Sequence, residues 1–175
     1  MLVKIARLVP GKRYPILFDV VKKMVIDEGK DIKLLVISDG PLMSDFEKYL
    51  KSNNLENTIF LLGNILNVID YLAASDVVPL LSDAEASNSV IKEAGLVKKV
   101  VIVCNNVGDF DDYIVQGKSG LFMNRENPNT DLYHYLSDIY SGKYNTKFLG
   151  ENLYDSVINT FSIDNVISSY NELNV

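Results

Sequence analysis

The feature that most constrains the fold is a regular alternation, along most of the chain, of short β-branched runs with longer amphipathic stretches. The short runs have continuous apolar residues, which is typical of strands that are covered on both faces. Strands are predicted over residues 2–5, 33–37, 59–62, 77–80, 100–103 and 121–123. Between them, apolar residues at helical spacing predict helices over residues 16–26, 46–50, 65–74 and 89–97.

This order of elements predicts a doubly wound α/β fold, in which a parallel six-stranded sheet carries helices on both faces and is connected right-handedly. Residues 131–140, 148–160 and 162–173 are predicted to form helices that close one side of the sheet. Their Leu, Ile, Tyr and Phe positions are interpreted as packing stripes rather than ligand contacts.

Composition narrows the classes of ligand and location. The 175 residues favour a single domain, and 17 Lys and Arg against 23 Asp and Glu give a net charge of −6. This balance argues against a general nucleic-acid or anionic-membrane surface, so an anionic ligand must be met by a local cluster. No apolar run approaches the roughly 18 residues of a membrane-spanning helix, and no secretory leader is recognised, which predicts a cytoplasmic protein. Cys104 is predicted to be a buried hydrophobe.

Ligands of an open parallel sheet bind at the carboxyl ends of its strands, so the loops after the strands are where binding residues are expected. The loop after the first strand carries Arg7, Lys12 and Arg13, a basic cluster in an acidic chain. Guanidinium and ammonium groups beside a helix start suit a phosphate or diphosphate. The alternative is a solvated loop with ordinary surface cations. After the second strand, Gly40 permits close backbone approach.

The loop after the fourth strand carries two acids. Small and polar residues over 84–89 predict a loop that turns into a helix, with Ser87 or Asn88 as its N-cap. Glu85 then lies before the helix and Glu93 inside it, so both carboxylates can face one cleft and accept hydrogen bonds from vicinal diols. The alternative is that Glu85 favours the helix N-terminus and Glu93 is a solvated helix residue.

Other candidate sites are weaker. The acids at 109, 111 and 112 are interpreted as the start of a short helix rather than a metal site, and no metal or cofactor is expected. His134 is predicted to be a surface or packed residue. The sequence has no Gly-x-Ser-x-Gly elbow, no Walker-type loop, no Cys pair for zinc and no Gly-x-Gly-x-x-Gly after the first strand. Triad hydrolases, P-loop nucleotidases and dinucleotide dehydrogenases are therefore disfavoured.

Taken together, these loops resemble the donor-binding half of retaining GT-B glycosyltransferases, the glycosyl transferases group 1 family. The most specific match is the family's Glu, seven intervening residues, Glu and Ala, which appears here from Glu85 to Glu93 and Ala94. Residues 6–12 resemble the family's Gly-Arg-Leu…Lys segment, residues 38–41 its Gly-Asp-Gly-Pro turn, residues 61–63 its Phe-Leu-Gly, and residues 106–121 its Gly-Gly…Glu-x-Ile…Gly-x-x-Gly-Leu stretch. The chain departs from the family at several glycines, which are replaced by Ala6, Arg13 and Ser38.

The resemblance implies a role for each matched residue. Arg7 and Lys12 would hold the donor diphosphate and stabilise the charge that develops on it, and Glu85 would bind hydroxyls of the transferred sugar. Glu93 would bind the ribose hydroxyls. Backbone amides of Ser87, Asn88, Ser89 and Val90 would meet phosphate and sugar, the turn at Gly40 would approach the nucleotide, and the base would lie against Leu62 and Gly63.

The resemblance also implies what the protein would act on. Its donor would be a nucleotide diphosphate sugar carrying a hexose-type sugar, and its acceptor a saccharide or lipid-linked molecule in cell-surface polysaccharide or lipopolysaccharide synthesis. The acceptor would be bound by a second Rossmann-like domain, so residues 1–175 are expected to be one donor-binding domain of a larger enzyme, inactive alone. Peripheral membrane association of the full-length protein stays open.

Two other classes of function stay open beside this one. The first is an epimerase or phosphorylase of the same fold, which the order of motifs does not favour. The second is a non-catalytic module, either one that binds a nucleotide sugar or a response-regulator-like domain. A response-regulator-like domain would need an acidic pocket at the ends of the first and third strands, whereas the first loop here is basic.

Overall fold

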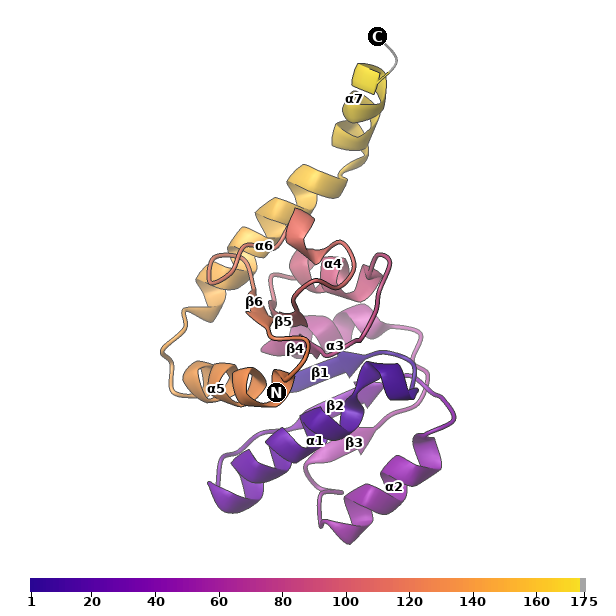
Figure 1. Cartoon of the computed structure of the whole chain (residues 1–175), viewed down its shortest axis with the longest axis vertical. Coiled ribbons are helices and arrows are strands. Elements are labelled where there is room, and N and C mark those ends of the chain that lie inside the picture. Colours follow the sequence, from indigo (N-terminus) through magenta and orange to yellow (C-terminus); the bar gives the residue numbers. More distant parts are fainter. Residues whose placement is uncertain (174–175) are drawn as a thin grey trace.

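A computed structural model describes residues 1–173 and shows a six-stranded sheet between two layers of helices (Figure 1). Its strands are β1 (Leu2–Ile5), β2 (Leu34–Ile37), β3 (Ile59–Leu61), β4 (Val77–Leu80), β5 (Val100–Cys104) and β6 (Leu121–Met123). Their order is β3-β2-β1-β4-β5-β6, and every neighbouring pair is parallel. The predicted doubly wound α/β fold is confirmed.

The strand order reverses between β1 and β4. The chain runs outward from β1 to β2 and β3, and then returns to β4 on the other side of β1 and continues to β5 and β6. At such a reversal the loops that leave the two central strands turn to opposite faces of the sheet and leave a crevice at the carboxyl edge. The β1–α1 and β4–α4 loops border this point.

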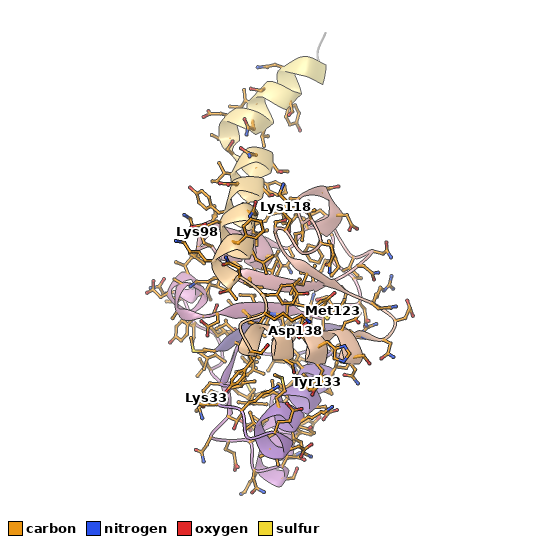
Figure 2. The ribbon with its side chains drawn as sticks, turned by 90° about the vertical axis from the view of Figure 1, so that its left-hand side faces the viewer. Lys33, Lys98, Lys118, Met123, Tyr133 and Asp138 are labelled. Atoms are coloured by element: carbon orange, nitrogen blue, oxygen red, sulfur yellow. The ribbon has the colours of Figure 1, made fainter. Side chains whose placement is uncertain are left out.

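The helices are α1 (Tyr14–Lys22), α2 (Met43–Ser52), α3 (Val68–Ala74), α4 (Ser89–Leu96), α5 (Pro128–Tyr140), α6 (Thr146–Phe161) and α7 (Ile163–Leu173). Helix α1 continues into a π-helical segment, η2 (Lys23–Asp27), and short 3₁₀ segments, η1 (Pro10–Lys12) and η3 (Phe110–Asp112), precede α1 and follow β5. Helix α1 packs against α5, while α4 packs against both α3 and α6. Helix α5, on which Figure 2 labels Tyr133 and Asp138, packs against β6, which carries the labelled Met123.

The predicted strands lie within one residue of where the apolar runs place them, whereas several helix ends differ, and α2 and α5 each begin three residues earlier than predicted. Helix α1 begins at Tyr14 rather than 16, because the buried Tyr14 ring packs on Phe18 and Phe46 and belongs to the core of that layer. Helix α3 begins at Val68 rather than 65, and Leu66 is fully exposed in the preceding loop. Its apolar side chain therefore gave a false helical signal.

Helix α7 contradicts the expectation that all three late helices close the sheet. Helices α5 and α6 pack on the strands, but α7 extends away from the rest of the molecule (Figure 1). The backbone is extended at Ser162, which redirects the chain past the edge of the sheet. Ile163 and Ile167 are 74% and 52% exposed, so the apolar stripe of α7 does not pack on this domain.

Three further predictions can be compared with the structure. Cys104 is buried at the end of β5, as predicted, and His134 is exposed on α5. Within residues 1–173, no helix combines the length and the apolar character that crossing a membrane would require.

Candidate functional site

The candidate site is formed by the two loops that meet at the reversal of strand order. The β1–α1 loop, residues 6–13, touches the β4–α4 loop, residues 81–88, through its backbone, because the Asp83 amide donates to the Gly11 carbonyl over 2.9 Å. A side chain on one loop can therefore reach the other without any movement of the sheet.

Lys12 and Glu85 are joined across these loops. The Lys12 Nζ lies 2.5 Å from the Glu85 Oε1, and the two side chains are 21% and 12% exposed. Burial pushes the pKa of Glu85 upward, but the hydrogen bond and the charge of Lys12, together with hydrogen bonds from Ser82 and Asn88, lower it below its ordinary value. Glu85 is thus an ionised, half-desolvated carboxylate held by a cation.

Arg13 strengthens the same junction. Its guanidinium forms an ion pair with Asp83 and donates from Nη1 to the Arg125 carbonyl over 2.5 Å. Arg125 lies in the β6–α5 loop, where its own amide donates to the Asn105 side chain over 3.0 Å. Asp83 and Arg125 are not among the residues predicted for the site, although both follow predicted strands and lie at the edge where ligands bind.

Two residues that replace family glycines occupy glycine-like backbone conformations. The φ angle is 50° at Arg13 and 138° at Ser38, both in the positive region that L-residues avoid. The backbone at these loops therefore keeps the path that a glycine would allow, at the expense of local strain. At Arg13, the bonds to Asp83 and Arg125 oppose this cost.

Gly40 lies against the β1–α1 loop. A Cβ atom at this position would be 2.5 Å from the carbonyl oxygen of Leu8, and the Leu8 amide donates to the Asp39 carbonyl over 3.0 Å. The close approach that Gly40 permits is therefore to the backbone of Leu8. Any contact with a donor nucleotide stays a prediction.

The end of β3 supplies the position predicted for the base. The Ser38 amide donates to the Gly63 carbonyl over 2.9 Å, which joins the loops after β2 and β3. No atom lies within 4 Å of the position that a Cβ would take at Gly63, so this backbone is open on one side. Leu62 lines a groove of about 400 Å³ between α2 and β3, whose lining includes apolar side chains of β3 and charged ones of α2.

The start of α4 is fixed by side chains of its own loop. Asn88 is the N-cap, and its side-chain oxygen accepts a hydrogen bond from the Ile91 amide over 3.2 Å. This selects Asn88 from the two predicted caps. The Lys92 Nζ lies 2.5 Å from the Ser87 Oγ and 2.7 Å from the Asp109 carboxylate, so Lys92 ties the loop to the segment after β5.

The acids after β5 begin a short helix, as predicted. Asp111 and Asp112 lie within η3, and Asp109 precedes it. Burial raises the pKa of Asp109, but hydrogen bonds from Lys92 and Ser87 together with the Lys92 charge lower it overall. In the described part of the chain, no group of three or more His, Cys, Asp and Glu side chains is placed to hold a metal ion.

The remaining predicted residues lie on the β1–α1 loop and on helix α4. Arg7 is exposed in the β1–α1 loop, and Glu93 is partly exposed in the middle of α4, beyond Ser89 and Val90. The structure thus brings Lys12 and Glu85 into contact. It places Arg7 on the same loop as Lys12 and Glu93 on the helix that follows Glu85.

The family model described as glycosyl transferases group 1 matches residues 1–155 of the chain. The chain is 27% identical to N-acetyl-alpha-D-glucosaminyl L-malate synthase of Bacillus anthracis over 140 residues. These residues are 80% of this chain and 36% of that protein. It is 29% identical to a subunit of phosphatidylinositol N-acetylglucosaminyltransferase of Saccharomyces cerevisiae over 116 residues. These residues are 65% of this chain and 25% of that protein. The chain therefore spans well under half the length of the curated relatives that it matches.

Solved structures share the fold. S. aureus TarM in a complex that includes UDP superposes with a TM-score of 0.84 at 21% identity, over 98% of this chain and 35% of that one. Anabaena HepE in complex with UDP-glucose superposes with a TM-score of 0.83 at 19% identity, over 99% of this chain and 49% of that one. The C-terminal domain of LpcC from Francisella tularensis superposes with a TM-score of 0.79 at 21% identity, over 93% of this chain and 86% of that one. The chain has the Rossmann-like fold of a GT-B C-terminal domain and belongs to the glycosyl transferases group 1 family.

Proposed function

We propose that the chain binds the nucleotide diphosphate sugar of a retaining glycosyltransferase, which transfers a hexose-type sugar to a saccharide or lipid-linked acceptor in cell-surface polysaccharide or lipopolysaccharide synthesis. The observation that carries the proposal is the Lys12–Glu85 pair at the reversal of strand order. A cation and a carboxylate there offer one partner for phosphate oxygens and one for sugar hydroxyls.

The cations act on the diphosphate. Lys12 and the exposed Arg7 neutralise its charge when it binds, and they stabilise the additional negative charge that builds up as the glycosidic bond breaks. Lys12 is already oriented by Glu85, so little side-chain entropy is lost when a phosphate oxygen becomes its second partner.

The acids act on hydroxyl groups. Glu85, kept ionised by Lys12, accepts hydrogen bonds from the transferred sugar, and Glu93 accepts them from the ribose diol. The amides of Ser87 to Val90 at the start of α4 meet the phosphate and the sugar, because free N–H groups and the helix dipole favour an anion there. The base lies against the open backbone at Gly63 and the neighbouring Leu62.

Uridine diphosphate sugars are the best first candidates for the donor. Two of the similar structures are named as complexes with UDP or UDP-glucose, and both similar curated enzymes carry N-acetylglucosamine in their names. These names describe those proteins, and they support the choice of ligand for the first experiment.

We also propose that this chain is one domain of a larger enzyme whose acceptor-binding domain lies outside residues 1–175. The short span relative to the curated relatives supports this arrangement. The chain alone then binds donor without transferring sugar, whereas the whole protein transfers it.

Calorimetric titration of the chain with UDP-glucose tests the proposal. Saturable binding is expected, and Lys12→Met should weaken it at least tenfold, since one charge-assisted bond contributes about 1.5–3 kcal/mol. Lys48→Met on the exposed face of α2 is the matched control and should bind as the wild type does. No heat of binding at millimolar ligand, or equal affinity of the Lys12→Met variant, would contradict the assignment.

A further inference from the structure

Lys4 is a lysine buried completely within the sheet. It lies on β1, and its side chain has no exposed surface. Lysine is almost never fully buried unless its ammonium has partners, because removing the charge from water is costly. The partners of Lys4 therefore show what its burial achieves.

The first partner is the backbone of Lys12. The Lys4 Nζ donates a hydrogen bond of 2.7 Å to the Lys12 carbonyl oxygen, across the whole β1–α1 loop. The side chain of Lys12 leaves this same residue to reach Glu85. Lys4 thus anchors the main chain at Lys12, the residue whose side chain enters the candidate site.

The second partner is Tyr14, the first residue of α1. The Lys4 Nζ lies 4.5 Å from the centroid of the Tyr14 ring, and the Tyr14 hydroxyl donates to the Ala6 carbonyl at the start of the loop. Lys4 and Tyr14 together hold both ends of the loop that carries Arg7 and Lys12.

We propose that Lys4 is a positioning residue of the donor site, whose ammonium holds the Lys12 backbone in the binding geometry and whose charge state sets the affinity for the donor diphosphate. This inference rests on the proposed function, because it takes the diphosphate to be the ligand of Lys12. It assigns Lys4 no contact with the ligand.

The groups around Lys4 allow its charge to change near neutral pH. Burial lowers its pKa from the ordinary 10.5 to about 7, and the charge of Lys12 acts in the same direction, whereas Glu85 of the β4–α4 loop favours the charged form. Cys104 of β5 also faces Lys4, but burial raises the pKa of its thiol to about 11, so it carries no charge near neutral pH. Tyr14 faces it from α1. The protonated form is the stronger hydrogen-bond donor to the Lys12 carbonyl.

Diphosphate binding should couple to this proton. A diphosphate on the Lys12 loop brings negative charge near Lys4 and raises its pKa, so by linkage the protonated protein binds the diphosphate more tightly. A rise of one pKa unit on binding corresponds to an affinity that falls about tenfold as the pH rises past the free and bound pKa values.

The experiment measures the affinity for UDP-glucose between pH 6 and 9. This ligand is preferred to UDP, because the terminal phosphate of UDP itself titrates near pH 6. The wild type should lose affinity about tenfold over this range, and Lys4→Met should show a flat profile. Lys30→Met is the matched control: Lys30 is also partly buried and lies near aromatic rings, but it pairs with Glu28 before β2 and should leave the profile unchanged.

A second measurement needs neither ligand nor variant. The Cε carbon signal of Lys4 should titrate near pH 7 in the free chain, and the amide signal of Arg13, which directly follows the Lys12 carbonyl, should follow the same midpoint. Titration of the Lys4 signal near 10.5, or an Arg13 amide that does not follow it, would overturn the inference even if Lys4→Met failed to fold.

The two hypotheses fail in different ways. UDP-glucose binding whose pH profile is the same in the wild type and in Lys4→Met would overturn the role of Lys4 and leave the donor site intact. Absence of binding at every pH would overturn the proposed function, and with it the effect of Lys4 on affinity, while joint titration of Lys4 and Arg13 would still support the hold on the loop.

Discussion

Lys12 and Glu85 are 73 positions apart in the chain, yet their ammonium and carboxylate groups lie 2.5 Å from each other. They leave neighbouring strands, β1 and β4, at the same edge of the sheet. The contact therefore follows from the doubly wound topology, which brings the loops after these strands together at the point where the strand order reverses.

The Lys12–Glu85 pair should make stability depend on acid. Because the folded-state pKa of Glu85 is lowered, its contribution is present above its ordinary pKa of 4.5 and is lost as the pH falls through the lower folded value. Lys12→Met should therefore lower the free energy of unfolding at pH 7 by about 1–3 kcal/mol, and this difference should shrink below pH 4. Urea denaturation at both pH values measures it; a difference that is equal at the two would contradict the assignment.

Lys4 should make stability rise with pH in a second, higher range. Its folded pKa of about 7 lies below the ordinary 10.5, so between these values the unfolded chain binds more protons and stability rises with pH. The slope for one proton is about 1.4 kcal/mol per pH unit. Urea denaturation between pH 7 and 8, where the Cys104 thiol stays largely protonated in the folded and the unfolded chain, should show this rise in the wild type and lose it in Lys4→Met. Equal slopes would count against a titrating Lys4.

Glu93 should contribute to nucleotide affinity. Replacing Glu93 by Ala leaves the ribose diol without its acceptor and is expected to weaken UDP binding by about 1–3 kcal/mol. Glu151→Ala on α6 removes an acid outside the candidate site and should have no effect. Calorimetry of the two variants makes the comparison, and an unchanged affinity in Glu93→Ala would reject the ribose assignment.

Gly40 should be intolerant of a side chain. In Gly40→Ala the new Cβ would come within 2.5 Å of the Leu8 carbonyl oxygen, so the loops after β1 and β2 must separate, at a cost of about 1–3 kcal/mol in unfolding free energy. Gly11→Ala is the matched control, since a Cβ there meets the Asp83 carboxylate only at 3.6 Å. Thermal denaturation of both variants tests this, and equal melting temperatures would mean that the loops are not packed in this way.

Ser38 should be improved by glycine. Its φ angle of 138° is strained for an L-residue, so Ser38→Gly is expected to raise the free energy of unfolding by about 1 kcal/mol. Lys48→Gly, within the helical backbone of α2, should instead lower it by a similar amount. Chemical denaturation that shows loss of stability in both variants would exclude strain at Ser38.

Much of this fold could be predicted from the order of apolar runs. Strands covered on both faces, such as β5, have continuous apolar residues. Such a run can be recognised as a strand without knowing which elements pack on it. The packing of α7 could not be predicted, because Ile163 and Ile167 give the same helical spacing whether the stripe packs on this domain or extends beyond it. Helical spacing defines a face and not what covers that face.

The candidate site was predictable where residue type and loop position agree, as for Lys12 and Glu85. The resemblance named these residues, and the parallel topology explains their contact. Lys4 could not be recognised, because a lysine in a short strand ordinarily points toward solvent, and only the packing of β1 under the loop shows its burial. The partners of Arg13 were missed because Asp83 and Arg125 are distant in sequence.

The central claim is that two segments bind one nucleotide sugar together: the β1–α1 loop, and the β4–α4 loop with helix α4. The most direct measurement is a titration of the isotope-labelled chain with UDP-glucose, followed through the backbone amide signals. Saturable shifts at Arg7, Lys12, Glu85 and Glu93 with a common dissociation constant are the expected result. Shifts confined to one of the two segments, or none at millimolar ligand, would contradict the claim.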